Sequence, residues 1–83
     1  MIKENKIVPA FKALQHIFIT SRWMAGKGYN PESIYDLLDG AEFLAGLAAR
    51  IEDKTEEFED YLKMICEKHG CHQALSVFNG SAN

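Results

Sequence analysis

The chain has 83 residues and a formal net charge of −3, and 47% of its residues are hydrophobic. This length allows one domain with one core, and the hydrophobic content excludes a disordered chain. No apolar run reaches the roughly 18 residues that a membrane span requires, and the first residues lack the apolar stretch of a signal peptide, so we predict a cytoplasmic protein without a membrane segment.

The charge is unevenly distributed along the chain. Residues 1–30 carry five basic side chains and one acidic, whereas residues 31–83 carry four basic and eleven acidic. One interpretation is a basic first helix that lies against acidic later helices, because charges usually occupy solvated faces. The other interpretation is a contact with an oppositely charged molecule.

A first helix is predicted after a flexible arm formed by residues 1–7. Pro9 is tolerated only in a first helical turn, so the helix begins at residues 8–10, and it ends at residue 25 or 26. Its predicted core stripe is Ala10, Phe11, Leu14, Ile17, Phe18, Met24 and Ala25. A second apolar cluster, Ile19 and Trp23, lies on nearly the opposite side, with Lys12, His16 and Lys27 at its border.

The second helix has the longest apolar periodicity in the chain, over residues 33–51. Asn30 is its predicted cap and Pro31 its first residue, and a short connection makes the first two helices antiparallel neighbours. The stripe is Ile34, Leu37, Leu38, Ala41, Leu44, Ala45, Ala48 and Ile51. Gly40 and Gly46 weaken this helix, and close approach of a neighbouring helix is the predicted reason for both.

Two more helices are predicted after residue 51. Asp53 is the expected cap of the third helix, with Glu56 three residues later, and Gly70 ends it in a left-handed conformation. Its buried stripe is Phe58, Tyr61, Leu62, Ile65 and His69. A short fourth helix over residues 71–78 turns Ala74, Leu75 and Phe78 inward, and residues 79–83 form a flexible tail. The prediction is an all-α single domain over residues 1–83, a compact antiparallel three-helix bundle with a short fourth C-terminal helix.

Two groups of residues contain side chains that can bind a metal or take part in catalysis. Cys66, His69, Cys71 and His72 are types that bind zinc, but a zinc finger separates its ligand pairs by a dozen or more residues, so we interpret them as core and surface residues and predict no metal or cofactor. The clustered carboxylates are expected to be solvated, and no histidine, acid and nucleophile are arranged for catalysis. We therefore predict no catalytic residues and no enzyme.

Off-stripe apolar residues on both of the first two helices indicate partner binding. Phe43 and Leu47 lie four residues apart beside Asp36 and Asp39, so they complement the basic border of the first-helix cluster. The predicted interface consists of Ile19, Trp23, Lys27, Asp36, Asp39, Phe43 and Leu47. The predicted function is a helical interaction module that binds a second copy or another protein.

Three alternatives to this function remain open. In a monomer, the N-terminal arm would cover Trp23 and the C-terminal segment would cover Phe43. A nucleic-acid-binding protein would use the cations around Trp23, although the acidic overall balance opposes this function. A regulatory protein that binds zinc would use the four Cys and His residues.

Overall fold

The structure, a computed structural model, describes residues 5–80 and contains four α-helices in this range. They are α1 (Ile7–Gly26), α2 (Pro31–Ala48), α3 (Ile51–His69) and α4 (His72–Asn79). The predicted all-α class is confirmed. Most of the predicted arm and tail lies outside the described residues, but Ile7 belongs to α1 and Asn79 to α4, so the helices extend slightly further than expected.

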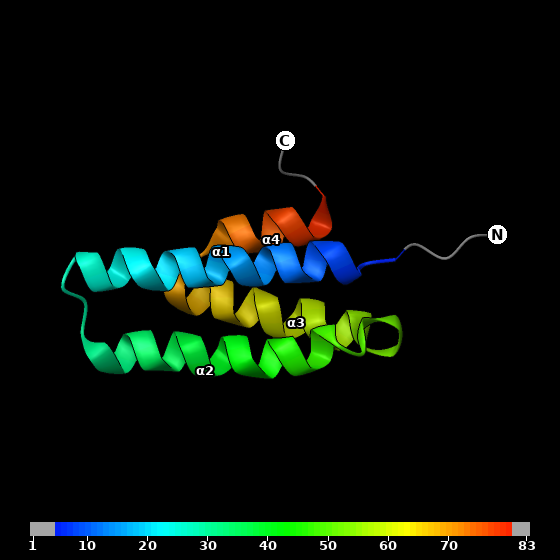
Figure 1. Ribbon diagram of the computed structural model, residues 1–83, viewed down its shortest axis with the longest axis horizontal. Coiled ribbons are helices and arrows are strands. Elements are labelled where there is room, and N and C mark those ends of the chain that lie inside the picture. Colours follow the sequence, from blue (N-terminus) through cyan, green and yellow to red (C-terminus); the bar gives the residue numbers. More distant parts are fainter. Residues whose placement is uncertain (1–4, 81–83) are drawn as a thin grey trace.

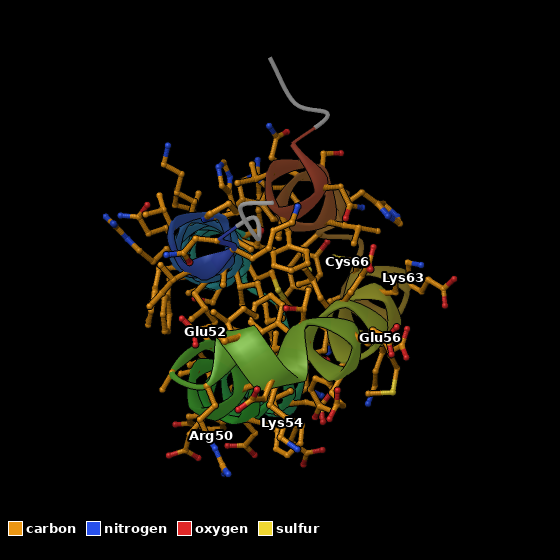
Figure 2. All side chains as sticks on the ribbon, turned by 90° about the vertical axis from the view of Figure 1, so that its right-hand side faces the viewer. Arg50, Glu52, Lys54, Glu56, Lys63 and Cys66 are labelled. Carbon is orange, nitrogen blue, oxygen red and sulfur yellow. The ribbon has the colours of Figure 1, made fainter. Side chains whose placement is uncertain are left out.

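The helices stand around one core. Short connections join them, and in Figure 1 the chain reverses its direction at each connection. α1 packs against α2 and α4, and α3 packs against the same two helices, whereas α1 and α3 barely touch. Seen from its end in Figure 2, the molecule has its helices at four corners around a filled interior. Within residues 5–80, α4 makes no contact with α2.

Several helix ends follow directly from local sequence. The Asn30 side chain accepts a hydrogen bond of 2.9 Å from the Glu32 backbone N–H, which satisfies one donor at the start of α2, and Pro31 follows at the first helical position. Gly70 ends α3 with a positive φ of 73°, a conformation that costs glycine little. These predicted boundaries are confirmed.

The boundary between α2 and α3 differs from the prediction. α2 ends at Ala48 and Ile51 opens α3, so the apolar stripe crosses a turn instead of following one helix. Lys54 then interrupts α3 with non-helical angles (φ −122°, ψ 19°). The predicted cap at Asp53 is wrong, because α3 begins at Ile51 with Arg50 at the cap position, and Asp53 lies within the first turn. Lys54 projects outward in Figure 2, and its Nζ lies 3.3 Å from the Glu57 carboxylate.

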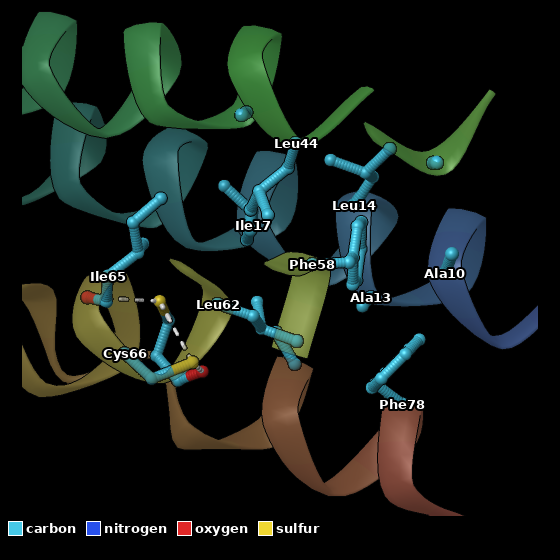
Figure 3. Packing of buried hydrophobic residues seen from close by; sticks show 14 of the residues in the cluster. Ala10, Ala13, Leu14, Ile17, Leu44, Phe58, Leu62, Ile65, Cys66 and Phe78 are labelled. Atoms are coloured by element: carbon cyan, nitrogen blue, oxygen red, sulfur yellow. Dashed lines mark hydrogen bonds between the residues drawn. The ribbon is translucent and has the colours of Figure 1, made fainter. Parts of the chain in front are cut away.

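The core combines large apolar residues from all four helices with buried alanines, two of which lie on α1. Figure 3 shows Phe58 near Leu14 in the middle of the core, and the ring centroid of Phe58 lies 4.8 Å from that of Phe78 on α4. On α1 the buried residues are Ala10, Ala13, Leu14, Ile17, Ser21 and Met24. The predicted stripe was wrong for three members, since Phe11, Phe18 and Ala25 are exposed. Alanines instead face inward, which lets α2 and α4 approach α1 closely.

The two glycines of α2 have different surroundings. A methyl group at Gly40 would collide with the side chain of Ile65 on α3, so close approach accounts for this glycine, as predicted. Nothing lies within 4 Å of the position where a methyl group at Gly46 would stand, so the same explanation is wrong there.

Candidate interaction surface

The outward side of α1 carries an apolar surface in place of the charged face that is usual for a surface helix. Six of its large apolar side chains are between 38% and 58% exposed: Ile7, Val8, Phe11, Phe18, Ile19 and Trp23. We call these six residues, together with Lys12, Gln15 and Arg22, the α1 surface. Its only charges are positive, because α1 contains no Asp or Glu.

An apolar groove runs along this surface where α1 meets α2. Its volume is about 540 Å³, and Phe11 and Phe18 lie seven residues apart along it. The complete lining is Ile7, Val8, Phe11, Lys12, Leu14, Gln15, Phe18 and Ala45. Leu14 is nearly buried and Ala45 half-buried, so these two form the floor, and Lys12 supplies the only charge.

Trp23 lies further along α1, in a smaller aromatic group. Its ring centroid is 5.6 Å from that of Tyr29, at an interplanar angle of 53°, and the Lys27 Nζ lies 5.9 Å from the centroid of the indole ring. These contacts leave the Trp23 side chain 54% exposed. The structure thus places Lys27, the cap residue just past the end of α1, against Trp23.

The predicted second cluster lies toward α3. Phe43 is 53% exposed, and its ring centroid lies 4.5 Å from that of Tyr61 on α3, while Leu47 is half-buried against the core. Because α4 does not contact α2, the predicted cover of Phe43 by the C-terminal segment is wrong; Tyr61 gives partial cover instead. Asp39 is exposed nearby. Trp23 and Phe43 contact different neighbours and do not meet within one copy.

Asp36 makes contacts within the chain. Its Oδ2 lies 2.8 Å from the Lys68 Nζ and 2.9 Å from the His69 Nε2. The hydrogen bond from Lys68, followed by that from His69, lowers the pKa of Asp36 because both favour the carboxylate. These bonds tie α2 to the last turn of α3, so this predicted interface residue is engaged before any partner binds.

The Cys and His residues do not form a metal site in the described part of the chain. Cys66 and Cys71 are buried with their sulfur atoms 3.8 Å apart, and the Cys66 thiol donates to the Cys71 carbonyl at 2.9 Å (Figure 3). His69 binds Asp36, and His72 is exposed. Between residues 5 and 80, no three potential ligands converge. The hydrogen bond with Cys71, together with burial, raises the pKa of Cys66.

Sequence reasoning missed the groove because it assigned Phe11 and Phe18 to the core. α1 has two apolar rows, and helical periodicity does not say which of them faces inward. The two rows differ in the size of their side chains. The row with Ala10 and Ala13 allows close helix packing, and the row with the two phenylalanines does not.

Comparison with protein-family models, with curated proteins and with solved structures finds no match for this chain. Among the described residues, no helix combines the length and the apolar character needed to cross a bilayer.

Proposed function

We propose that this chain is a helical protein-interaction module that self-associates and acts by binding a protein, not by chemistry. In this proposal the module is an antiparallel three-helix bundle completed by the short α4, and it works in the cytoplasm. One observation carries the proposal: α1 is apolar on its outward side as well as on its core side. Exposed apolar residues that lie together among polar ones, here Lys12, Gln15 and Arg22, mark interaction sites.

The surroundings of the α1 surface support a protein as the partner. The groove has an apolar lining with one cation, and hydrophobic side chains with a few polar groups are typical of the centre of a protein interface. Phosphate recognition needs several cations together, and Lys12, Arg22 and Lys27 are spread over 16 residues of sequence. This spacing favours a protein partner over a nucleic acid.

The titratable groups support a function without catalysis. The groups with displaced pKa values are Asp36, Glu57, Cys66 and Cys71, and none of them lines the groove. Catalytic sites usually place such groups in a concave pocket. The groove therefore offers shape and apolar contact.

Replacement of Phe18 by serine tests this proposal. The side chain is half-exposed, so the change removes contact area from the α1 surface with little effect on the core. We expect native mass spectrometry to show a dimer for the natural chain and a monomer for Phe18→Ser, with equal helicity by circular dichroism. Tyr35→Ser is the matched control, because Tyr35 is a 66% exposed aromatic residue on α2 outside the α1 surface.

A natural chain that stays monomeric at every concentration would contradict self-association. A dimer that survives Phe18→Ser and Trp23→Ala alike would place its interface away from α1. If Trp23 lies at the centre of the interface, its loss should weaken assembly by roughly 2 kcal/mol or more.

A further inference from the structure

We propose that the groove on α1 receives α1 of a second copy, in antiparallel orientation, with the two-fold axis between Leu14 and Gln15. This inference rests on the proposed function and adds the partner, the orientation and the register.

Six positions on this side of α1 are spaced symmetrically. In chain order they are Ile7, Phe11, Leu14, Gln15 and Phe18, which line the groove, and Arg22 of the α1 surface beyond it, and the separations of four, three, one, three and four residues read the same in both directions. An antiparallel second copy in this register sets Phe11 against Phe18, Leu14 against Gln15 and Ile7 against Arg22. Both phenylalanines then have an aromatic partner, and such pairs add stability beyond their buried area.

The middle of the groove has the geometry of a socket for a side chain. Residues 11, 14, 15 and 18 are four neighbours on one helix face, the arrangement that receives a single side chain in packed helix pairs. Leu14 and Ala45 form its floor, and Phe11 and Phe18 stand at its ends. Because the interface is two-fold symmetric, each copy presents the same socket and the same aromatic rings.

The charges on α1 favour the antiparallel orientation. With no carboxylate on this helix, a parallel pair in register would place Arg22 beside Arg22 of the second copy. Antiparallel pairing about Leu14 and Gln15 separates the two arginines by roughly 22 Å along the helix axis, at a rise of about 1.5 Å per residue. Each arginine then lies over Ile7 of the other copy, where its alkyl part covers apolar surface.

The surface is large enough for a modest dimer. Five half-exposed apolar side chains on each copy, at roughly 100 Å² apiece, bury about 1,000 Å² in total, which is below the range of stable interfaces and within that of weak, transient ones. These five are Ile7, Val8, Phe11, Phe18 and Ile19. A dimer in reversible exchange with monomer is therefore expected.

Charge changes at Gln15 test the position of the axis. Gln15 is exposed, so the fold should tolerate Gln15→Glu and Gln15→Lys. Next to a two-fold axis, each change brings like charges together in its own dimer. We expect about tenfold or greater weakening of self-association for Gln15→Lys, which adds to the charge of Lys12, and a smaller weakening for Gln15→Glu, whose carboxylate lies near Lys12. Mixed together, the two variants should form a dimer again, because the opposite charges then meet across the axis.

Native mass spectrometry with one variant isotope-labelled distinguishes the mixed dimer from the two self-dimers. Gln73→Glu and Gln73→Lys are the matched controls, since Gln73 is an exposed glutamine on α4 outside the α1 surface. They should dimerise like the natural chain, alone and mixed. Restoration of the dimer only in the Gln15 mixture supports the proposed axis, because a structural defect at Gln15 would not be repaired by a second defective copy.

Two outcomes would overturn the inference. If both Gln15 variants dimerise as the natural chain does, the copies meet through another surface, such as Trp23 of one copy against Phe43 of the other, and the proposed self-association survives. If the natural chain is monomeric in the same experiment, both the inference and the proposed self-association are contradicted.

Discussion

At the scale of single residues, the Cys66 thiol shows how the fold controls a side chain. Its hydrogen bond with Cys71 and its burial raise its pKa, whereas the same thiol in the unfolded chain titrates near its usual value of about 8.5. The folded state therefore holds a proton that the unfolded state loses in alkali. The stability contributed by this thiol is fully present below about pH 8.5 and decreases as the pH rises above that value.

We expect urea unfolding to show a lower free energy of unfolding at pH 10 than at pH 7, with part of this decrease absent in Cys66→Ala. The alanine variant is less stable at both pH values because it leaves a cavity, by about 2 kcal/mol, so the change between pH values is the quantity to compare. An equal change in both proteins would contradict the prediction. In the native protein, iodoacetamide should modify neither cysteine rapidly, since both thiols are buried away from the reagent.

Residue type explains why the sequence predicted the core of α3 and α4 better than that of α1. Phe58, Leu62 and Phe78 are buried as predicted, because each stands in the main apolar row of its helix. On α1, hydrophobicity alone ranks phenylalanine above alanine, yet Ala10 and Ala13 face inward. The choice depends on the distance to α2 and α4, which is a property of the assembled helices.

At the scale of helices, the two glycines of α2 provide a matched comparison. Alanine improves helix propensity by about 1 kcal/mol at a position where it meets no obstacle. Gly46 is such a position, so Gly46→Ala should raise the free energy of unfolding by up to about 1 kcal/mol. At Gly40 the new methyl group must displace the buried Ile65, and overpacking of this kind costs about 1–3 kcal/mol.

We therefore expect thermal unfolding to give a higher Tm for Gly46→Ala than for the natural chain and a lower Tm for Gly40→Ala. Each protein is the control for the other, because the substitution and the helix are the same. An equal gain in both would mean that α2 and α3 separate easily at Ile65.

The helix ends show which boundaries a sequence can predict. Asn30, Pro31 and Gly70 act through their own backbone and side-chain geometry, so their effects are local and were predicted correctly. The break at Lys54 is not local. Ile51 turns into the core, where it is 3% exposed, and α3 therefore begins before the polar residues that resemble its cap.

At the scale of the whole molecule, the exposed apolar side chains of α1 link stability with function. A chain of 83 residues buries a limited share of its surface, and this one leaves six large apolar side chains of α1 exposed. Burial of the same side chains in a dimer would add to the stability of each copy. Folding and association should therefore be coupled.

This coupling predicts that the Tm depends on protein concentration. A dimer that dissociates as it unfolds is stabilised by mass action, so its Tm rises with concentration, whereas the Tm of a monomer stays constant. We expect differential scanning calorimetry of the natural chain to show a Tm that rises as the protein concentration is increased about a hundredfold. Gln15→Lys should give a nearly constant Tm close to that of the diluted natural chain, because it keeps the fold and loses the partner. A constant Tm for the natural chain would show that the α1 surface contributes nothing to its stability through self-association.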